Sequence, residues 1–459
     1  MKETDHAPES WARCSLADIV VLNPKNDASA EQTAGFVPMA LAPTDYHGAL
    51  QHEEKVWGEI KKSYTNFADG DVIFAKVTPC FENGKAAIVR DMPSGIGAGS
   101  SEFYVLRPTS KEISPSLLFA IIKTQSFMQQ GAENMTGAVG LRRVPRAFVE
   151  SFPIALPPAA EQKVIADKLD TLLAQVENTK ARLERIPQIL KRFRQSVLAA
   201  AVSGRLTEEW REQNAIAPGN TRELDEVIES SFYGPRFSKN DYTKGDSGVP
   251  TIRTTDMKNG TIRISPETPK VEVAPEKLDQ FKLIPGDLLI TRTGSIGVMA
   301  LFEGDYIAIP SAYLIRFRLK PSVDKRFIYY ALTSPDAQQQ MGLSSTAITQ
   351  PNINAKSIRA LKITLPTQDE QTEIVRRVDQ LFAHADRIEQ QVTNALARVN
   401  NLTQSILAKA FRGELTEQWR KDNPTLISGE NSAEALLERI KAERAAVKPV
   451  KKTRKTVSS

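Results

Sequence analysis

The sequence predicts an α+β protein with two similar β-rich domains, each followed by one long helix. Three observations support this prediction. The segments SGRLTEEWREQ (203–213) and RGELTEQWRKD (412–422) are nearly identical and lie 209 positions apart. An apolar seven-residue period precedes each of them, and a turn-punctuated, β-rich stretch precedes each periodic segment. We therefore expect a chain made of two repeated halves.

The composition is that of an ordinary globular protein. The chain has 459 residues, of which 41% are hydrophobic and 25% charged, enough for two to four domains. It contains no apolar run of about 18 residues, and MKETDHAPESWARC at its start lacks the apolar core of a signal peptide. We expect a cytoplasmic protein with no membrane contact. Cys14 and Cys80 lack zinc or redox spacing, which predicts two reduced thiols.

The net charge of +5 is unevenly distributed along the chain. Residues 1–155 hold 15 Lys and Arg against 18 Asp and Glu, residues 213–364 hold 19 against 16, and residues 421–459 hold 9 against 5. The final KPVKKTRKTVSS has five basic residues and no acid. We interpret it first as a solvated end and second as a nucleic-acid arm.

The repeat extends well beyond the two similar ends. LPPAAEQKVIADKLDTLLAQ (156–175) aligns with LPTQDEQTEIVRRVDQLFAH (365–384) at the same offset of 209 residues. The two halves therefore predict five parts: a first domain, a first helical region, a second domain, a second helical region and a C-terminal segment, at residues 1–155, 156–212, 213–364, 365–420 and 421–459.

Each helical region carries apolar residues at alternating spacings of four and three, which form a narrow seam on a helix. The first seam is Ile165, Leu169, Leu172, Val176, Thr179, Leu183, Ile186, Leu190, Phe193 and Val197. The second seam is Ile374, Val378, Leu381, Ala385, Ile388, Val392, Ala395, Val399, Leu402 and Ile406. Two such seams predict helices that pack on each other, although two amphipathic helices, each lying on its own domain, remain an alternative.

Other residues predict where these helices bend and end. Pro187 lies inside the first helix and predicts a kink or break near Ile186. Gly204 and Gly413 stand where a left-handed residue ends a helix. The segments after these glycines contain Trp210 and Trp419, which are expected to pack at equivalent corners.

The β-rich stretches also resemble each other. FADGDVIFAKVTP (67–79) parallels LIPGDLLITRTGS (283–295), and in both a Gly-Asp turn precedes an apolar strand. The strands are expected at 72–75 and 288–290, and each ends in a loop that bears a base. A helical segment (114–130 or 325–341) and a small-polar loop (137–145 or 346–354) then follow.

Segments that resemble catalytic or cofactor-binding motifs do not match those motifs fully. GIGAGS (95–100) lies between two β patterns and does not open a helix, so a dinucleotide site is not expected there. LNPKN (22–26) lacks the second proline and the aromatic residue of an amino-methyltransferase motif, and there is no GxxxxGK[ST]. The four histidines have no metal-ligand spacing, and the close pair, His47 and His52, is interpreted as solvated. The pattern is typical of a binding protein, with an unrecognised enzyme site at 95–100 as a rival.

Two similar domains held by a rigid spacer suit the reading of two separated pieces of one polymer, and DNA fits that description. Arg, Lys, Asn and Gln recognise base edges, whereas hydroxyls and amides fix the register on phosphate. The loops of the two domains supply such groups, and we predict DNA contacts at Lys76, Thr78, Arg142, Arg143, Arg292, Thr293, Ser295, Gln350 and Asn352.

The two repeated blocks, from LPPAAEQKVIADKLDTLLAQ to SGRLTEEWR and from EQTEIVRRVDQLFAHADRIEQQ to RGELTEQWR, resemble the specificity subunit of bacterial type I restriction-modification enzymes, the K-family (type IA) in particular. DNPTLISGENSAEALLERIKAERAA (422–446) is similar to the tails of that group, so the resemblance covers nearly the whole chain.

The resemblance implies two target recognition domains, each reading one half of an asymmetric bipartite DNA site. It implies that the helices pair as an antiparallel coiled coil with pseudo-twofold symmetry, and that they are the spacer and the docking surface for two methylation subunits. The spacer and docking residues are then Leu169, Leu172, Val176, Val378, Leu381, Ile388, Trp210 and Trp419. S-adenosylmethionine, ATP and Mg would belong to the methylation subunits and two restriction subunits, with no cofactor in this chain. A non-enzymatic scaffold that binds another partner through its twin domains is the alternative.

Overall fold

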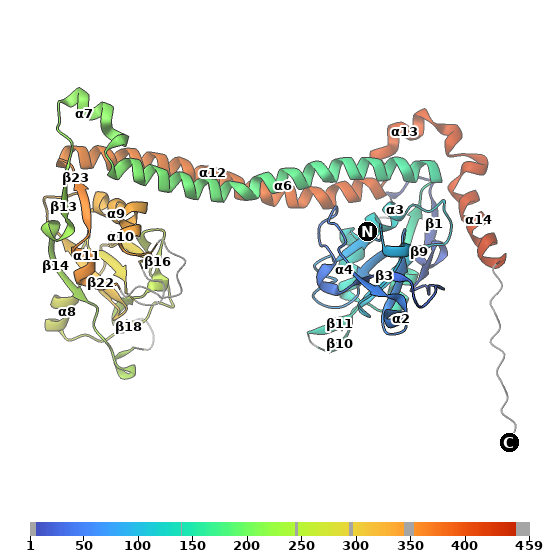
Figure 1. Ribbon diagram of the computed structural model, residues 1–459, viewed down its shortest axis with the longest axis horizontal. Coiled ribbons are helices and arrows are strands. Elements are labelled where there is room, and N and C mark those ends of the chain that lie inside the picture. Colours follow the sequence, from blue (N-terminus) through green and yellow to red (C-terminus); the bar gives the residue numbers. More distant parts are fainter. Residues whose placement is uncertain (1–5, 139, 244–246, 293–296, 344–352, 447–459) are drawn as a thin grey trace, which may run out of the picture. The chain divides into compact units, whose positions relative to one another are not determined.

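The computed structural model describes residues 6–138, 140–243, 247–292, 297–343 and 353–446. It divides into two compact units: unit 1 comprises Met1–Glu184 and Asn394–Ser459, and unit 2 comprises Arg185–Thr393. Each unit therefore contains a part of both repeated halves (Figure 1).

The described part of unit 1 contains two four-stranded sheets and two short strand pairs. The first sheet has the order β2-β9-β6-β7 and is antiparallel throughout, while the second has the order β4-β3-β8-β5, in which β3 and β8 run parallel. The strands are β1 (Ala12–Ser15), β2 (Val20–Leu22), β3 (Thr33–Val37), β4 (Glu53–Val56), β5 (Thr65–Ala68), β6 (Val72–Ala75), β7 (Ala86–Ile88), β8 (Ile96–Gly99), β9 (Phe103–Pro108), β10 (Thr136–Ala138), β11 (Leu141–Arg143) and β12 (Pro153–Leu156).

The helices of unit 1 pack on the first sheet through an aromatic cluster. Phe127 is fully buried, and its ring contacts those of Phe74, Phe81, Phe148 and Phe152. The shorter helices of this unit are α1 (Leu16–Ile19), α2 (Trp57–Ile60), α3 (Pro115–Ile122), α4 (Gln125–Glu133), α5 (Arg146–Ser151), α13 (Glu417–Asp422) and α14 (Ala433–Ala446).

Unit 2 repeats this frame. Its main sheet has the order β14-β22-β19-β20, equivalent to β2-β9-β6-β7, and β15 runs parallel to β21 as β3 does to β8. Its strands are β13 (Asn220–Glu223), β14 (Ile228–Tyr233), β15 (Val249–Ile252), β16 (Met257–Lys258), β17 (Thr261–Ile262), β18 (Lys270–Val271), β19 (Leu288–Thr291), β20 (Met299–Leu301), β21 (Ile309–Pro310), β22 (Leu314–Leu319) and β23 (Lys362–Leu365). Its shorter helices are α7 (Glu208–Asn214), α8 (Pro275–Phe281), α9 (Lys325–Thr333), α10 (Pro335–Gln340) and α11 (Ala355–Arg359).

The helical segment predicted in each domain is confirmed, but two helices and not one occupy each segment. In unit 1, α3 ends before Thr124, whose hydroxyl accepts a hydrogen bond from the Phe127 amide and caps α4. In unit 2, Ser334 caps α10 in the same way through the Ala337 amide. Thr and Ser at these positions satisfy a free helix N–H and so favour a new helix start over a continuous helix.

The predicted Gly-Asp turns begin the central strands β6 and β19 and anchor them. Gly70 and Gly286 have φ of +88° and +93°, which favours glycine. The buried carboxylate of Asp71 accepts two hydrogen bonds from Arg107 at 2.7 and 2.8 Å, and that of Asp287 accepts two from Arg318 at 2.9 Å. The same bidentate pair therefore joins the same two strands in both units.

The two long helices are α6 (Ala159–Val202) and α12 (Gln368–Phe411), each 44 residues long. At about 1.5 Å per residue each measures about 66 Å. Of the kink or break predicted near Ile186, the break is wrong, because α6 continues through the exposed Pro187. Proline removes only one backbone hydrogen bond, and helical residues on both sides of Pro187 maintain the helix.

Within each unit, the two long helices run antiparallel. In unit 1 the start of α6 meets the turn after α12, and in unit 2 the start of α12 meets the turn after α6. Ile165 and Leu169 share one buried cluster with Leu407 of α12 and with the first domain, and Val197 and Val378 share the equivalent cluster of unit 2. The helix ends thus pack on each other and on a β-rich domain at once, so both packing arrangements considered from the sequence occur.

Burial follows most of the predicted seam. Leu172, Val176, Leu381 and Ile388 are half-buried, whereas Thr179 and Leu402 are exposed. The seam prediction is therefore wrong at Thr179 and at Leu402.

Candidate nucleic-acid interface

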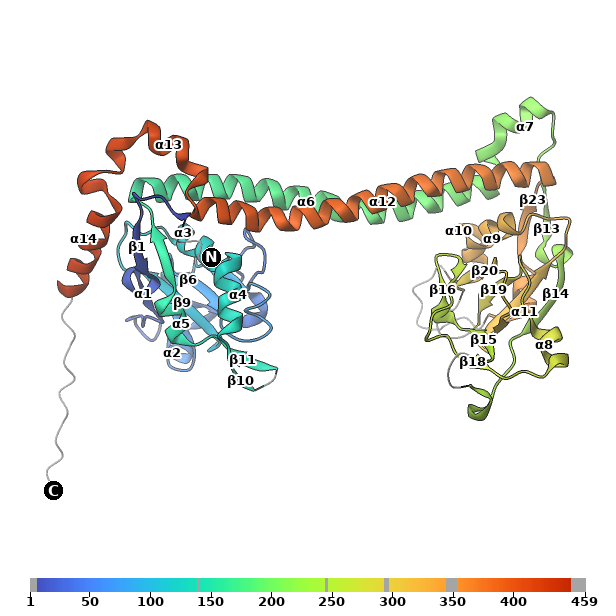
Figure 2. The same cartoon turned by 180° about the vertical axis from the view of Figure 1, so that it is seen from behind.

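The structure brings four predicted contact residues of unit 1 together at the loop after β6. Lys76 and Thr78 lie in this loop, and Arg142 and Arg143 lie on β11 of the β10–β11 hairpin. The Thr78 amide donates to the Arg142 carbonyl at 3.0 Å, and the Thr78 hydroxyl accepts from the Arg142 amide at 3.0 Å. Figure 2 shows this hairpin projecting from unit 1 on the side opposite the long helices. Thr78 thus fastens the hairpin to the loop, and the loop and hairpin together carry three cationic residues, Lys76, Arg142 and Arg143.

Glu102 orients one of these cations, and the carbonyl of the neighbouring Ser101 holds another. Arg143 donates to its carboxylate at 2.7 and 2.9 Å, and this contact holds the pKa of Glu102 below its usual value. Lys76 donates to the Ser101 carbonyl at 2.8 Å. Among the residues that the structure describes, the Arg142 side chain makes only a long 3.6 Å ion pair with Glu82, and this side chain is 46% exposed. Arg142 is therefore the least restrained of the three cations.

The equivalent loop of unit 2 carries Arg292. Its amide donates to the Tyr313 carbonyl at 3.0 Å, as the Lys76 amide donates to the Glu102 carbonyl at 2.9 Å. The Arg292 guanidinium lies 4.8 Å from the centre of the Tyr233 ring. The remaining predicted residues of this surface, Thr293, Ser295, Gln350 and Asn352, lie outside the described residues.

Sequence reasoning missed Glu102, Tyr233 and Tyr313 as members of these surfaces. Glu102 and Tyr313 occupy the same place, immediately before β9 and β22, and Tyr313 is 62% exposed. Exposed aromatic rings stack on bases and sugars, and they also hold guanidinium planes. Aligning the two halves at the residue before each of these strands would have found this pair. The pair shows that one backbone frame carries an acid in unit 1 and an aromatic ring in unit 2.

Two equivalent contacts between the repeats, here called clasps, explain the repeated ends. In clasp 1 the buried Glu161 carboxylate accepts from Thr416 and Arg420, both at 2.5 Å. In clasp 2 the buried Glu370 accepts from Thr207 at 2.7 Å and Arg211 at 2.6 Å. The LTExWR segment after each helix therefore binds the start of the other helix, and both copies are needed to complete both units.

Each clasp also closes the turn in which it lies. Arg420 donates to the Gly413 carbonyl at 2.8 Å, and Arg211 to the Gly204 carbonyl at 2.6 Å. As predicted, both glycines are left-handed, with φ of +71° and +75°. Trp210 and Trp419 are half-exposed on the following helices α7 and α13, where their carbonyls accept equivalent hydrogen bonds from Asn214 and Asn423.

The two clasps differ in one contact. In clasp 1 the second oxygen of Glu161 accepts from the Trp11 indole N–H at 2.9 Å. The second oxygen of Glu370 has no hydrogen-bond partner among the described residues. Trp11 immediately precedes β1, and Gly219 immediately precedes the equivalent strand β13. Clasp 1 is therefore the more completely bonded of the two.

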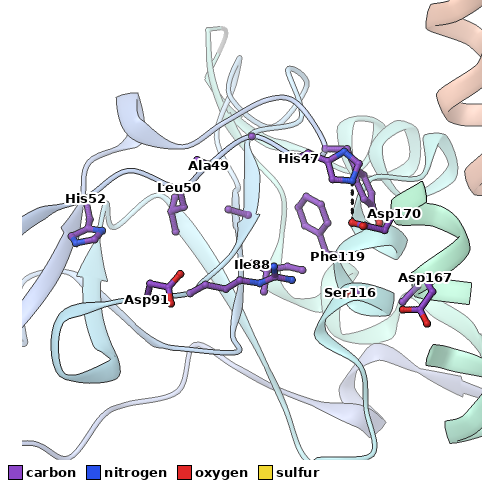
Figure 3. A pocket seen from close by; sticks show the side chains of 15 residues that line it. His47, Ala49, Leu50, His52, Ile88, Asp91, Ser116, Phe119, Asp167 and Asp170 are labelled. Carbon is purple, nitrogen blue, oxygen red and sulfur yellow. Dashed lines mark hydrogen bonds and ion pairs between the residues drawn. The ribbon is translucent and has the colours of Figure 1, made fainter. Parts of the chain in front are cut away.

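A cavity of about 570 Å³ in unit 1 lies between the loop around His47, β7, α3 and α6, as Figure 3 shows. His47 is not simply solvated, because its ring lies 2.7 Å from Glu177 and 3.1 Å from Asp170, both on α6. Glu177 also accepts from the backbone amides of Tyr46 and His47. These contacts attach the first domain to α6, and the mixed polar and apolar cavity lining includes no cluster of metal-binding type among the described residues.

GIGAGS forms the strand β8 and not a phosphate-binding loop. A side chain at Gly97 would meet the Phe67 ring at 2.3 Å, which explains the glycine by close packing.

Cys14 and Cys80 are free, and burial raises the pKa of Cys14 to about 12. Among the described residues, no helix is long and apolar enough to cross a membrane.

Comparison with known proteins identifies the family. A family model described as type I restriction modification DNA specificity domain matches residues 8–188 and 219–398. The StySPI specificity subunit of Salmonella potsdam is 44% identical over 464 residues, 98% of each chain. The EcoKI specificity subunit of Escherichia coli strain K12 is 44% identical over 361 residues, 76% of each chain.

Two solved structures share the fold. One, from work on complex assembly and conformational transition of the type I R-M system, covers 89% of this chain and 99% of its own with a TM-score of 0.72 and 21% identity. The other, the HsdS subunit from Thermoanaerobacter tengcongensis, covers 89% and 98% with a TM-score of 0.61 and 21% identity. The resemblance stated from the sequence is confirmed: the chain belongs to the family of specificity subunits of type I restriction-modification enzymes.

Proposed function

We propose that units 1 and 2 each read one half of an asymmetric, two-part DNA target. In this proposal α6 and α12 set the gap between the halves and dock two methylation subunits. As a specificity subunit, the chain provides sequence recognition to a type I restriction-modification complex and is not its catalyst. The family assignment does not support the alternative of a scaffold for another polymer.

The observation that carries this proposal is the repeated frame with different side chains at one position. Lys76 and Arg292 follow equivalent strands, yet Lys76 neighbours the acid Glu102 and Arg292 neighbours Tyr233 and Tyr313. Side chains discriminate between bases through the donors and acceptors that they present in the groove, whereas the backbone frame positions these side chains. Two domains that share a backbone frame but carry different side chains on it support recognition of two different half-sites.

The partners follow from the family. Type I restriction-modification implies DNA, methylation subunits and restriction subunits as partners, and we propose two copies of each subunit. S-adenosylmethionine, ATP and Mg are assigned to those subunits and not to this chain. Acting on DNA within such a complex, the protein is proposed to work in the cytoplasm.

Arg142 provides the first test of the interface. In complexes with the methylation subunits, Arg142→Ala is expected to weaken cognate binding roughly ten- to a hundredfold and to relax the choice of base at one position of one half-site. Quantitative binding to duplexes substituted at each position measures both effects. Arg146→Ala, which removes a cation from the neighbouring helix α5, is the matched control and should leave base preference unchanged. An unchanged preference in Arg142→Ala would remove this residue from the interface.

A further inference from the structure

Arg292 directly follows the central strand β19 of unit 2, and the backbone at this point is fixed from both sides. The Arg292 amide donates to the Tyr313 carbonyl at 3.0 Å, and the amide of the preceding Thr291 donates to the Val298 carbonyl at 3.0 Å. The buried Thr291 hydroxyl also accepts from the Val298 amide at 3.0 Å. These bonds to the segments before β22 and β20 fix the point from which the Arg292 side chain leaves the sheet.

Tyr233 holds the guanidinium of Arg292 against its ring. The guanidinium carbon lies 4.8 Å from the ring centre, within the range of an attractive cation–π contact. The ring is itself fixed at its far end, because the Tyr233 hydroxyl accepts from the amide of Ala355, the first residue of α11, at 3.0 Å. The next residue, Gly234, donates its amide to the Leu314 carbonyl at 3.0 Å, which ties the end of β14 to β22. The Tyr233 ring is therefore a fixed platform for a planar cation.

No carboxylate neutralises Arg292 among the described residues, where neither an ion pair nor a side-chain hydrogen bond joins it to a neighbour. The equivalent surface of unit 1 is different. There Lys76 donates to a backbone carbonyl, and Glu102 accepts two hydrogen bonds from Arg143. Tyr313 occupies the place of Glu102, so unit 2 has no acid at this position. The N–H donors of Arg292 therefore face no acceptor in the described part of unit 2.

A guanidinium on an aromatic platform is well matched to one base in particular. The major-groove edge of guanine presents two acceptors, O6 and N7, and the planar arginine fork donates a hydrogen bond to each. Adenine has a donor in place of one of these acceptors, and lysine supplies a point charge without the fork. Contact with the Tyr233 ring removes rotational freedom that Arg292 otherwise loses on binding, so it lowers the entropic cost of recognition.

We propose that Arg292 reads a guanine in the half-site of unit 2 and that Tyr233 is the residue that positions it. The inference rests on the DNA-reading function proposed above, and it names the base that one side chain of unit 2 selects. It requires a G·C pair in that half-site. A phosphate contact by Arg292, which carries no base preference, is the competing use of the same charge.

Removal of one acceptor from the DNA tests the contact at the level of atoms. The half-site of unit 2 is the one that stays unchanged when residues 1–155 are exchanged, and its guanines are replaced one at a time by 7-deazaguanine, which lacks N7. Binding is measured for the whole complex with methylation subunits. At one guanine the replacement is expected to weaken binding by the wild-type chain about tenfold, because an acceptor of a charged donor is lost.

The same duplexes are then bound by Arg292→Ala. This chain is expected to bind the unmodified duplex roughly ten- to a hundredfold more weakly. Replacement of the selected guanine should change its affinity by less than about twofold, because the two changes remove the same hydrogen bond. Equal sensitivity of the wild type and Arg292→Ala to 7-deazaguanine at every guanine would overturn the proposal, and so would a half-site without a G·C pair.

Arg292→Lys distinguishes base reading from charge. It keeps the cation but loses the fork, so it is expected to lose the preference for G·C at the selected position almost as fully as Arg292→Ala. Arg222→Lys is the matched control, at an exposed arginine on β13 that pairs with Glu226 at 3.0 Å, and it should leave every base preference unchanged. An Arg292→Lys chain with wild-type affinity and base preference would overturn the proposal in favour of a phosphate contact.

Two substitutions of Tyr233 test the platform. Tyr233→Phe keeps the ring and is expected to retain most of the base preference. Tyr233→Leu removes the ring, and the preference at the same base pair should fall at least about threefold while the half-site of unit 1 is read as before. Equal preferences in the wild type and Tyr233→Leu would overturn the positioning role of Tyr233. None of these results affects the reading of one half-site by each domain, which the exchange of residues 1–155 tests separately.

Discussion

Insertion of seven residues after Thr179 of α6 and seven after Ile388 of α12 is expected to lengthen the gap in the DNA target while both half-sites stay the same. One heptad preserves the apolar seam and adds about 10 Å to the helix pair. At about 3.4 Å per base pair, the gap should grow by about three base pairs. Sequencing of modified adenines in cells that carry the variant and its methylation subunits measures the gap directly.

Two controls distinguish an effect of the length of the helix pair from an effect of disturbing the helices. A seven-residue insertion in α6 alone leaves the two helices unequal and is expected to abolish modification. Substitution of exposed Lys163 by Ala on the same helix should leave the gap unchanged. Modification at the original spacing by the double insertion would show that α6 and α12 do not set the gap.

Glu161→Ala is expected to have the largest effect on stability. Removing this carboxylate leaves the Arg420 guanidinium largely buried without its counter-charge, which costs about 3–5 kcal/mol when a buried pair is broken. It also leaves the Trp11 indole N–H without its acceptor. Hydrogen exchange should become faster in the turn around Thr416 and at the start of α6, while unit 2 retains its protection.

Glu370→Ala is the matched variant within the same chain. It breaks clasp 2 and is expected to affect unit 2, but by about 1 kcal/mol less, since Glu370 has one hydrogen bond fewer than Glu161. Equal losses of protection in both units from either variant would contradict the assignment of one clasp to each unit.

The repeat and the β-rich frame could be predicted because they depend on local residue patterns. The offset of 209 residues, the Gly-Asp turns and the left-handed Gly204 and Gly413 are visible in the sequence and confirmed in the structure. The reason for the repeated ends could not be seen, because Glu161 meets Arg420 only after the chain has folded back across 259 positions. Spacing within one helix carries no information about this contact.

Other differences between prediction and structure have local causes. Thr124 and Ser334 divide the predicted helical segments because a hydroxyl that caps a helix start outweighs the helix propensity of the flanking residues. Leu173 is buried where the seam predicts Leu172, because the start of α6 also faces the core of the first domain. A helix that packs on two surfaces buries residues that do not follow the spacing expected for either surface alone.

The central claim is that each recognition domain reads its own half of the target. Exchange of residues 1–155 for the equivalent domain of a relative, followed by sequencing of modified adenines, tests it most directly. The account predicts that one half-site changes to that of the donor while the other half-site and the gap remain. Alteration of both half-sites, or of neither, would contradict it.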